Sequence, residues 1–529
     1  MAKKFTVTTV CIPSRHYMAD ISEKIDRIVK MYIEENYYFT INRARQYGKT
    51  TILEGLFQRL KKDYYVLDMS FEGKDFMFTS EREFVKGFHT LLVKAMKSCS
   101  APEALYADWI NEPDEPLGIM YLDAKITALC QHSDKEIILM IDEVDKASNN
   151  EVFLTFLGLL RDKYINREKG RDVTFKNVIL ASVYDIKNMK LKMRSESERH
   201  YNSPWNVAVD FDVDMSFSKA DIATMLQDYE DDHQYGIDID WFSGQIYEYT
   251  SGYPYLVSRI CQMIDMKVWR DAEFKTKKAA WTPAGFQKAV RLVLKSDCTL
   301  FDDVIKNLDL YPELNQKLRN MLIQGISYTF NKGDHSINLG TLFGYFKEEN
   351  EKAIISNRIF ETYLYDMYYA REGEDSELAN QSKLEKYSFI KDGMLDMDLV
   401  LERFKVHYDT IYSERDEKFL EREGRFLFLT FLKPIINGTA NYYIESETRD
   451  QKRTDIIVDY LGKQFLVELK IWHGEEYQDK GRKQLCDYLD LYRQKKGWLV
   501  SFIFNQTKKK VTGIRKLEEA GKIITEVVL

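Results

Sequence analysis

Apolar and polar positions alternate in blocks through the first part of the chain, and the period of the pattern changes from block to block. Short runs rich in β-branched and aromatic residues predict strands, and they are separated by segments with helical spacing such as Thr51–Lys61. Because strands that alternate with helices build a parallel sheet covered on both faces, residues 1–220 are predicted to form an α/β core. The predicted strands are Tyr38–Ile41, Tyr64–Met69, Glu136–Ile141 and Val178–Val183.

The pattern becomes helical from Lys219 to about Val290, with one interruption at Ser251-Gly252-Tyr253-Pro254. Glycine followed closely by proline ends a helix and allows the chain to turn before the next one begins. Residues 221–295 are therefore predicted to form a helical lid.

Residues 296–370 combine helical stretches with a hairpin. The predicted strands Leu342–Lys347 and Ala353–Ser356 flank the charged turn Glu348–Glu351. Helices followed by a two-stranded wing predict a winged helix-turn-helix, although the acidic turn favours a rigid coupler over a DNA-contacting surface.

A polar stretch rich in charge and poor in large apolar residues, Arg371–Lys383, is the predicted linker. A helical connector, roughly Leu395–Tyr412, follows it and completes the segment 371–415. Residues 416–529 are predicted to be a separate α/β domain. The chain as a whole is therefore predicted to be an α/β multidomain protein.

Composition narrows the function classes only a little. At 529 residues the chain is too long for one hydrophobic core, and 44% apolar with 13% aromatic residues excludes wholesale disorder. No apolar run approaches the roughly 18 residues that span a bilayer, and the N-terminus lacks a signal peptide's apolar stretch. A cytoplasmic location without a membrane partner is expected. The six cysteines and eight histidines show no zinc-binding spacing.

Charge gives weak support for a nucleic-acid partner at one end of the chain. The net charge is −8, yet residues 421–529 carry 20 Lys and Arg against 16 Asp and Glu. A local basic excess favours contact with a phosphate backbone.

The tripeptide Gly48-Lys49-Thr50 follows a predicted strand and opens a predicted helix, as the end of a P-loop does. Glycine lets the backbone approach phosphate, Lys49 reaches the β- and γ-phosphates, and Thr50 can ligate Mg²⁺. The full motif has another glycine five residues earlier, and here that position is Arg43.

A second element of a nucleotide site is the apolar run Ile137–Ile141, which ends in Asp142-Glu143. This is the form of a Walker B strand, in which Asp142 joins the Mg²⁺ coordination and Glu143 acts on the attacking water. The alternative is a core strand that ends in solvated acids. The P-loop tripeptide upstream favours the functional interpretation.

The string Asn42-Arg43-Ala44-Arg45-Gln46-Tyr47-Gly48-Lys49-Thr50 resembles the P-loop of bacterial and archaeal AAA-like ATPases, a group within the signalling (STAND) branch of P-loop proteins. That group has an arginine-rich lead-in, with which Arg43 is compatible. Gly252-Tyr253-Pro254 resembles the Gly-x-Pro element of the lid in that branch. The resemblance implies ATP as ligand, held by Arg43, Gln46, Tyr47, Gly48, Lys49, Thr50, Thr51 and Asp142.

Two further roles at this site stay open. Ser182, at the end of a predicted strand, could be a sensor of the nucleotide or an ordinary strand residue. One of Arg161, Arg167 and Arg171 could reach the nucleotide of a neighbouring subunit in a homo-oligomer, although solvation at the surface is the more common role of such arginines.

The second candidate site is a predicted hairpin of Thr454–Tyr460 and Gln464–Trp472. Glu468 and Lys470 lie two positions apart, so their side chains share one face of the strand. If the loop is Gly462-Lys463, Asp455 lies opposite Lys470 on the same face, whereas a slip of one residue would turn it away.

Two carboxylates on one face require a cation between them, and Mg²⁺ or Mn²⁺ held by Asp455, Glu468 and a main-chain carbonyl meets that need. Such an ion activates water and Lys470 neutralises the developing oxyanion, which is the chemistry of a nuclease. The alternative is an exposed sheet face with an ordinary cross-strand ion pair.

Residues 418–529 resemble the PD-(D/E)xK nuclease superfamily, in particular the module fused behind AAA-like ATPases. The matching strings are Phe419–Gly424, Pro434–Gly438, Arg453-Thr454-Asp455, Glu468-Leu469-Lys470 and Gln484-Leu485. Thr454 stands where the superfamily's name-giving proline would be. The resemblance implies a restriction-endonuclease-like fold, a further metal-binding acid at Glu423 (or Glu421) and a glutamine beside the site at Gln484.

Three functions are compatible with these features. The first is a metal-dependent nuclease under the control of ATP, acting on nucleic acid, with DNA favoured, in defence or mobile-element biology. The second is a nucleotide-dependent switch or DNA-binding regulator whose nuclease-like domain only binds. The third, a structural scaffold, leaves both phosphate motifs unexplained.

Overall fold

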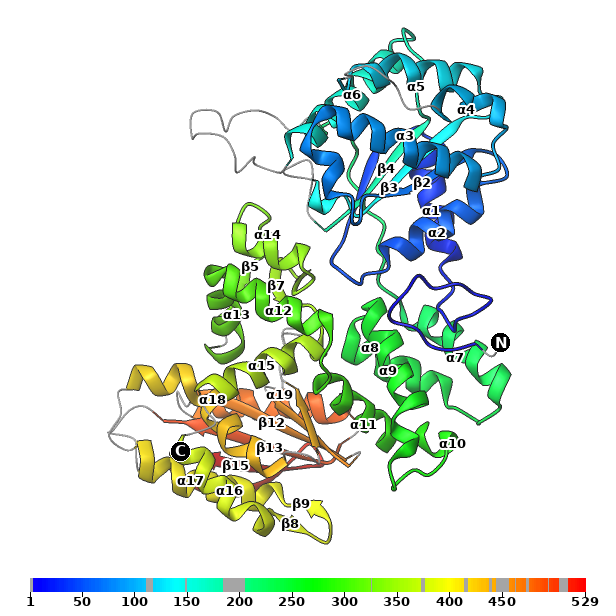
Figure 1. The fold of residues 1–529 in the computed structure, drawn as a ribbon. Helices are drawn as coiled ribbons and strands as arrows, with labels where there is room; N and C mark the ends of the chain where they lie inside the picture. The colour runs from blue at the N-terminus through cyan, green and yellow to red at the C-terminus, as the bar shows by residue number, and fades with distance from the viewer. Residues whose placement is uncertain are drawn as a thin grey trace. The chain divides into compact units, whose positions relative to one another are not determined.

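The computed structural model describes residues 3–529 apart from 111–117, 148–149, 184–204, 325, 373–375, 413–416, 437–439, 444–455, 462, 472–474, 493 and 504–511 (Figure 1). The chain divides into two compact units. The N-terminal unit comprises residues 1–229 and 253–255, and the C-terminal unit comprises residues 230–252 and 256–529. No described helix is long and apolar enough to cross a membrane.

The N-terminal unit is built on a sheet whose described strands are all parallel, in the order β1-β4-β3-β2. The parallel α/β core predicted from the alternating pattern is therefore confirmed. The four strands are β1 (Phe39–Asn42), β2 (Tyr65–Ser70), β3 (Ile137–Asp142) and β4 (Asn177–Ser182).

Helices cover both faces of this sheet. The apolar sequence of β3 explains why both faces are covered. Its residues are all buried and alternate between two apolar clusters, with Ile138 and Met140 in one and Leu139 and Ile141 in the other. A strand that is apolar on both faces has to be covered on both. The first face packs on α1 (Ser22–Ile28) and α2 (Lys49–Leu60), and the second on α3 (Glu81–Ser98), α4 (Glu103–Ile110), α5 (Tyr121–His132) and α6 (Glu151–Glu168).

A helical segment follows the core, as the sequence predicts. The turn between α8 and α9 uses left-handed backbone at Ser251 (φ 46°) and Gly252 (φ 72°), and Pro254 begins α9. Proline is tolerated at a helix start because its missing N–H has no partner there. The helices are α7 (Lys219–His233), α8 (Ile239–Thr250), α9 (Pro254–Met266), α10 (Lys277–Ala280) and α11 (Pro283–Leu294).

Residues 299–355 contain helices and a small sheet in the order β5-β7-β6. The hairpin differs from the sequence prediction. Glu348 and Glu349 belong to a strand, and the turn is Asn350-Glu351, both with positive φ (50° and 62°). The elements are α12 (Thr299–Leu310), α13 (Pro312–Gln324), β5 (Tyr328–Thr329), α14 (His335–Leu342), β6 (Phe346–Glu349) and β7 (Lys352–Ile355).

The stretch expected to be a polar linker is largely helical where it is described. It comprises the end of α15 (Arg358–Glu372) and the first part of α16 (Glu377–Glu385). Leu378 and Ala379 are fully buried, and α16 packs against α18 (Glu417–Ile436). Two short strands, β8 (Ile390–Lys391) and β9 (Met394–Leu395), and the helix α17 (Met397–Tyr412) complete this part.

The C-terminal sheet has the order β10-β11-β12-β13-β15-β14 in the described chain. β12 pairs antiparallel with β11 and parallel with β13, and the helix α19 (Glu475–Leu491) makes the connection between these two parallel strands. The strands are β10 (Ala440–Tyr443), β11 (Ile456–Tyr460), β12 (Lys463–Ile471), β13 (Lys496–Phe502), β14 (Gly513–Glu519) and β15 (Lys522–Val528).

Candidate functional site

The loop between β1 and α2 has the backbone that phosphate binding needs. Gly48, immediately before the first residue of α2, is left-handed with φ 82°, and Gln46 has φ 58°. Glycine adopts this conformation at no steric cost, which explains its place in the sequence. The N-terminus of α2 therefore opens directly behind the loop, where its free N–H groups and dipole favour an anion.

Lys49 is held inside this loop. Its Nζ donates hydrogen bonds to the carbonyl oxygens of Arg43 (2.9 Å) and Ala44 (3.1 Å). Burial lowers the pKa of the Lys49 ammonium, and the nearby acids Asp145, Glu143 and Asp142 oppose that shift. The ammonium of Lys49 is therefore buried against the carbonyl groups of the loop.

Thr50 and Asp142 meet across α2 and β3. The Thr50 hydroxyl donates to Oδ2 of Asp142 at 2.7 Å, and Oδ1 of Asp142 accepts from the Glu143 amide at 2.8 Å. Mg²⁺ takes hard oxygen ligands and is usually held by one or two protein groups, water and substrate phosphates. A threonine hydroxyl and a carboxylate side by side fit that donor set.

Glu143 and Asp145 lie in the turn after β3. Glu143 is left-handed (φ 56°), and burial, followed by the charge of Asp142, raises the pKa of its carboxyl group. Oδ1 of Asp145 accepts from both the Ser182 hydroxyl and the Val183 amide, each at 2.7 Å. Asp145 thus ties the end of β4 to the turn that carries Glu143. Sequence reasoning missed Asp145, although its position two residues after Glu143 was visible.

Asp68 is another acid at this edge that sequence reasoning missed. It is the one charged residue in the otherwise apolar run of β2, and it lies near Asp142 and Glu54. Asp68 is exposed to solvent, but desolvation by the surrounding protein, followed by the charges of Asp142 and Glu54, raises its pKa to about 6. The edge therefore concentrates negative charge where a cation would be bound.

Arg43 does not extend toward the loop interior. Its guanidinium donates to the carbonyl oxygens of Asn42 (2.9 Å), Phe211 (3.3 Å) and Val213 (2.9 Å) and lies 5.1 Å from the centre of the Phe211 ring. Burial lowers its pKa. The residue that replaces the first glycine of the motif therefore connects the loop to the segment before α7.

Tyr47 and Thr51 also contact protein groups. The Tyr47 ring packs edge-on against Tyr253 with centroids 4.7 Å apart, and Tyr253 donates its hydroxyl to the Arg45 carbonyl at 2.6 Å. The Thr51 hydroxyl accepts from the Cys11 amide at 3.3 Å. Tyr253 and Pro254, from the turn between α8 and α9, therefore line the loop.

The three arginines proposed as candidates for a neighbouring nucleotide lie in or after α6. Arg167 forms hydrogen bonds inside the N-terminal unit, because its guanidinium donates to the carbonyl oxygens of Phe175, Lys176 and Asn36. Arg161 lies within α6, and Arg171 is exposed beyond its end.

In the C-terminal unit the structure brings Glu468 and Lys470 together. Glu468 is fully buried, and the Lys470 Nζ lies 2.7 Å from its Oε1. The described register pairs Ile456 with Val467 and Tyr460 with Lys463, so Lys463 belongs to β12 and not to the turn. This register differs by two residues from the one expected.

The other members of the expected metal site belong to parts of the chain that the structure does not describe. Asp455 and Thr454 lie outside the described residues, as do the side chains of Glu421 and Glu423 in α18. Within the part that is described, no three His, Cys, Asp or Glu side chains cluster as a metal site.

The helix α19 packs on the face of the sheet that carries Glu468 and Lys470. A Cβ on Gly481 would lie 3.6 Å from Cγ of Lys470, so the lysine stem runs along this helix. Gln478 is 2% exposed and accepts a hydrogen bond from the Ser501 hydroxyl at 2.9 Å. Ser501 is the partner of Lys470 in the parallel pairing of β12 and β13. Gln484 also lies in α19, half-buried.

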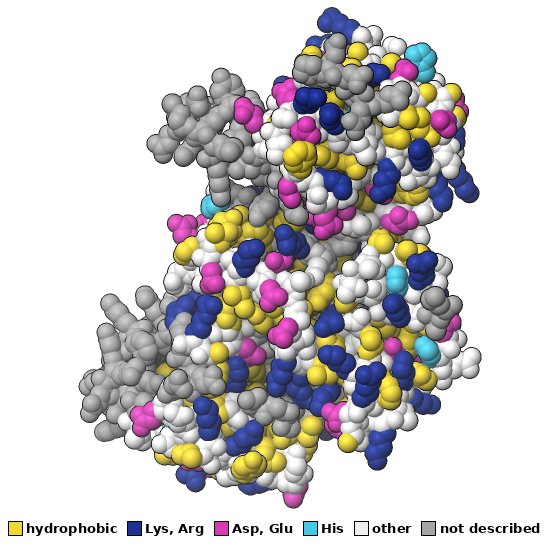
Figure 2. Space-filling model, in the orientation of Figure 1, with side chains coloured by type: hydrophobic (Ala, Val, Ile, Leu, Met, Phe, Trp, Pro, Cys, Tyr) yellow, Lys and Arg dark blue, Asp and Glu magenta, His cyan; other side chains and the backbone are white. Residues whose placement is uncertain are grey.

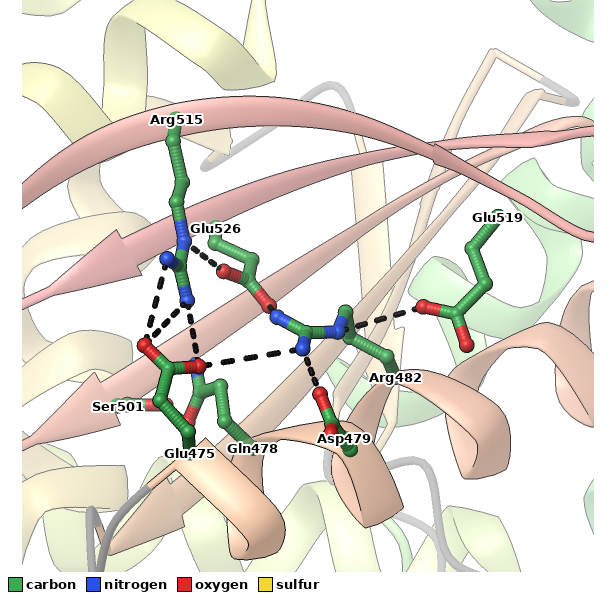
Figure 3. Close-up of polar contacts among 8 residues, drawn as sticks. All are labelled: Glu475, Gln478, Asp479, Arg482, Ser501, Arg515, Glu519 and Glu526. Atoms are coloured by element: carbon green, nitrogen blue, oxygen red, sulfur yellow. Dashed lines mark hydrogen bonds and ion pairs between the residues drawn. The ribbon is translucent and has the colours of Figure 1, made fainter.

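An ion-pair network fastens α19 to the strands β14 and β15 on this same face of the sheet (Figure 3). The fully buried Glu526 carboxylate on β15 contacts Arg482 of α19 at 2.8 Å and Arg515 of β14. Arg482 also pairs with Asp479 and with Glu519, and Arg515 with Glu475. A buried carboxylate is tolerated when cations and hydrogen bonds surround it, as here.

The profile of the AAA-like domain family matches residues 8–366. The chain belongs to that family. The match includes the P-loop, Asp142-Glu143 and the turn at Gly252-Tyr253-Pro254, and it ends before the C-terminal sheet. No protein with curated annotation matches the chain.

Solved structures with an overall likeness to this AAA-like protein include the Walker-type ATPase of Pyrococcus abyssi (13% identity, 68% of this chain and 99% of that chain, TM-score 0.46). Others are the ORC2 protein of Aeropyrum pernix (10% identity, 69% and 97%, TM-score 0.36) and the RuvB Holliday junction branch migration motor of Thermotoga maritima (13% identity, 66% and 94%, TM-score 0.30). The family assignment therefore rests on the match to residues 8–366.

Proposed function

We propose that this AAA-like protein binds and hydrolyses ATP in the loop between β1 and α2. The hydrogen bond between Thr50 and Asp142 carries the proposal, because it places a hydroxyl and a carboxylate together at the N-terminus of α2. Thr50 and Asp142 hold Mg²⁺, which neutralises the phosphates, and Lys49 contacts the β- and γ-phosphates. Glu143 orients the attacking water and accepts its proton.

The remaining residues of the loop have supporting roles in this proposal. Gln46, Tyr47 and Gly48 shape the path of the phosphates, while Arg43 and Thr51 hold the loop in place through their protein contacts. Residues 221–295 form the lid, with Tyr253 and Pro254 over the loop, and residues 296–370 form a winged-helix coupler.

We further propose that residues 416–529 form a metal-dependent nuclease domain that cuts nucleic acid, DNA in particular, under the control of ATP. The buried pair of Glu468 and Lys470 supports this, because a carboxylate is kept fully buried beside one ammonium. Asp455, Glu468 and Glu423 bind Mg²⁺ or Mn²⁺, Lys470 neutralises the oxyanion, and Gln484 lies beside the site. Glu423 lies in α18, Glu468 and Lys470 in β12 and Gln484 in α19, and this order of helix, strands and helix supports the proposal.

The alternative function is a nucleotide-dependent switch whose C-terminal domain binds nucleic acid without cutting it. One observation favours it: Lys470 forms an ion pair with Glu468 at 2.7 Å, which neutralises the charge of the buried carboxylate. Surface charge does not decide between the two. On the face drawn in Figure 2, basic side chains of the described residues are interspersed with acidic and apolar ones.

The experiment that tests the proposal is incubation of the full-length protein with plasmid and with single- and double-stranded oligonucleotides. Mg²⁺, Mn²⁺ and ATP are each added or withheld, and phosphate release is measured in parallel. We expect metal-dependent cleavage whose rate depends on ATP. Retention of nucleic acid without cleavage under every metal would establish the switch instead, and failure to release phosphate would overturn the ATPase.

A further inference from the structure

A buried hydrogen bond joins the helical lid to the C-terminal sheet within the C-terminal unit. Nε2 of Gln287 in α11 donates to Oδ2 of Asp459 in β11 at 2.6 Å, and each residue is 5% exposed. Burying a carboxylate is costly unless donors replace water. Removal of the Gln287 amide would therefore leave the buried Asp459 carboxylate without this donor and weaken the packing of α11 on β11.

Asp459 lies on the same face of the sheet as the Glu468–Lys470 pair. It is opposite Gln464 in the pairing of β11 and β12, and alternate residues of a strand share a face, so Gln464 and Glu468 face the same way. Four residues of strand separate them, a distance of about 13 Å. The lid helix α11 thus docks on the face that carries the proposed nuclease site.

Tyr249 connects this contact to α8. Nε2 of Gln287 also donates to the Tyr249 hydroxyl at 3.4 Å, and the Tyr249 ring packs on Phe286 of α11 with centroids 5.3 Å apart. Arg358 of α15 lies over the same ring and forms an ion pair with Glu248. The C-terminal end of α8 is therefore packed tightly against the elements that hold β11.

The chain leaves the end of α8 and immediately enters the P-loop region. Tyr253 follows Tyr249 by four positions, donates to the Arg45 carbonyl at 2.6 Å and packs on Tyr47. Pro254 lies 3.9 Å from the position of a Cβ on Gly48. Within the N-terminal unit these two residues therefore contact the loop in which we place the phosphates of ATP.

We propose that Tyr249–Pro254, together with Gln287, transmits the state of the P-loop to β11 and so regulates the C-terminal site. Nucleotide in the loop contacts Tyr47 and Gly48, which changes the position that Tyr253 and Pro254 prefer. Because only four positions, which include the left-handed turn at Ser251 and Gly252, separate Tyr253 from Tyr249, the displacement reaches the Gln287–Asp459 contact on the nuclease face. This regulation rests on the proposed function, since it requires ATP in the loop and a functional site beside Glu468.

The test is hydrogen exchange of the full-length protein with and without MgATP, read by mass spectrometry. In wild type we expect nucleotide to slow exchange in the P-loop and to change exchange in β11 and β12. In Gln287→Met, which keeps the size of the side chain but removes its donor, the P-loop response should remain while the response in β11 and β12 is lost. The matched control is the neighbouring Lys288→Gln, which breaks an ion pair with Asp271 inside the lid and should leave both responses intact.

Two further variants keep the proposal falsifiable if Gln287→Met destabilises the fold. Asp459→Asn retains an acceptor for the Gln287 amide and should keep the coupling. The double variant Gln287→Met/Asp459→Leu replaces both partners by apolar groups, which is close to neutral for stability, and should lose it. A response in β11 that persists in both Gln287 variants, or that is absent in wild type while the P-loop is protected, would overturn the proposal.

Cleavage is a second readout that separates this inference from the nuclease proposal. Coupling between sites typically changes an equilibrium by about fivefold or more, so we expect nucleotide to change the wild-type cleavage rate by that factor and the Gln287→Met rate by less than about twofold. If no variant cuts nucleic acid but the exchange responses follow the pattern above, the coupling stands and the nuclease fails. If cleavage responds equally to ATP in wild type and in Gln287→Met, the coupling fails and the nuclease stands.

Discussion

The Thr50 hydroxyl and the Asp142 carboxylate lie 2.7 Å apart, although 92 positions of sequence separate them. The first belongs to the helix that opens behind the P-loop, the second to the last residue of the neighbouring buried strand. The distance shows that the loop and strand are already set at the spacing that one ion can bridge.

Lys49→Ala should weaken the binding of MgATP. The ammonium supplies charge-assisted hydrogen bonds to phosphate, which contribute about 1.5–3 kcal/mol, so the affinity should fall by about tenfold or more. Isothermal titration calorimetry measures the change. Lys61→Ala, just after the end of the same helix, is the control and should bind as wild type does. Equal affinities for wild type and Lys49→Ala would remove the phosphate site from this loop.

Glu143→Gln should separate binding from hydrolysis. An amide keeps the size of the side chain but cannot accept the proton of water, and loss of a general base costs about 10²-fold or more in rate. We expect the variant to bind MgATP with wild-type affinity and to release phosphate at least that much more slowly. Glu72→Gln changes a nearby exposed acid and serves as the control. A variant that hydrolyses ATP at the rate of wild type would contradict the role of Glu143.

Asp68→Asn should stabilise the nucleotide-free protein at neutral pH. Desolvation by the surrounding protein and the neighbouring Asp142 raise the pKa of Asp68 to about 6, so the folded state holds its proton to a higher pH than the unfolded state. Stability is therefore lost as pH rises from about 4 to about 6, and the asparagine variant does not lose it.

Thermal melting without nucleotide or Mg²⁺ checks this prediction. The melting temperature of Asp68→Asn should exceed that of wild type more at pH 7.5 than at pH 5. Asp63→Asn, an exposed position just before β2, should show no such difference. An advantage that grows as pH falls would show that the charge of Asp68 stabilises the fold.

Glu468→Gln should abolish metal-dependent cleavage of plasmid DNA, because the amide removes a hard anionic ligand while it preserves the buried volume. Lys470→Met keeps the apolar stem along α19 and removes the charge, so it should slow cleavage by about 10²-fold without loss of metal binding. Glu518→Gln, an exposed acid of β14, is the control. Cleavage by Glu468→Gln at the wild-type rate would assign the activity to another site.

The parallel sheet of the N-terminal unit could be predicted because each strand is a short apolar run with a clear end. The run Ile137–Ile141 gave β3 within one residue, and Asp142 and Lys49 are placed by motifs that lie next to such runs. The partners of Arg43 could not be predicted. The carbonyl groups that it binds lie 168 and 170 positions away. Every residue has a backbone carbonyl group, so the residue type does not indicate which of them accepts a hydrogen bond.

The expected register of the C-terminal hairpin was wrong because it assumed that the loop is Gly462-Lys463, whereas Lys463 is a strand residue. In the structure Leu461 has φ 51° and Lys463 pairs with Tyr460, so the strands extend further than turn chemistry suggests. The stretch expected to be a linker is helical for a different reason. The side chains of Leu378 and Ala379 are buried because α16 packs against α18. Composition alone does not reveal that a polar segment has a neighbouring helix to pack on.

The position of Arg43 limits how this P-loop could change. A glycine there would match the common motif, but the carbonyl groups of Phe211 and Val213 would lose their guanidinium donor and the Phe211 ring would lose the cation over its face. The common and the arginine form are therefore not exchangeable by one substitution. A glycine at position 43 would therefore have to be accompanied by new donors for these carbonyl groups if the segment before α7 is to stay attached to the loop.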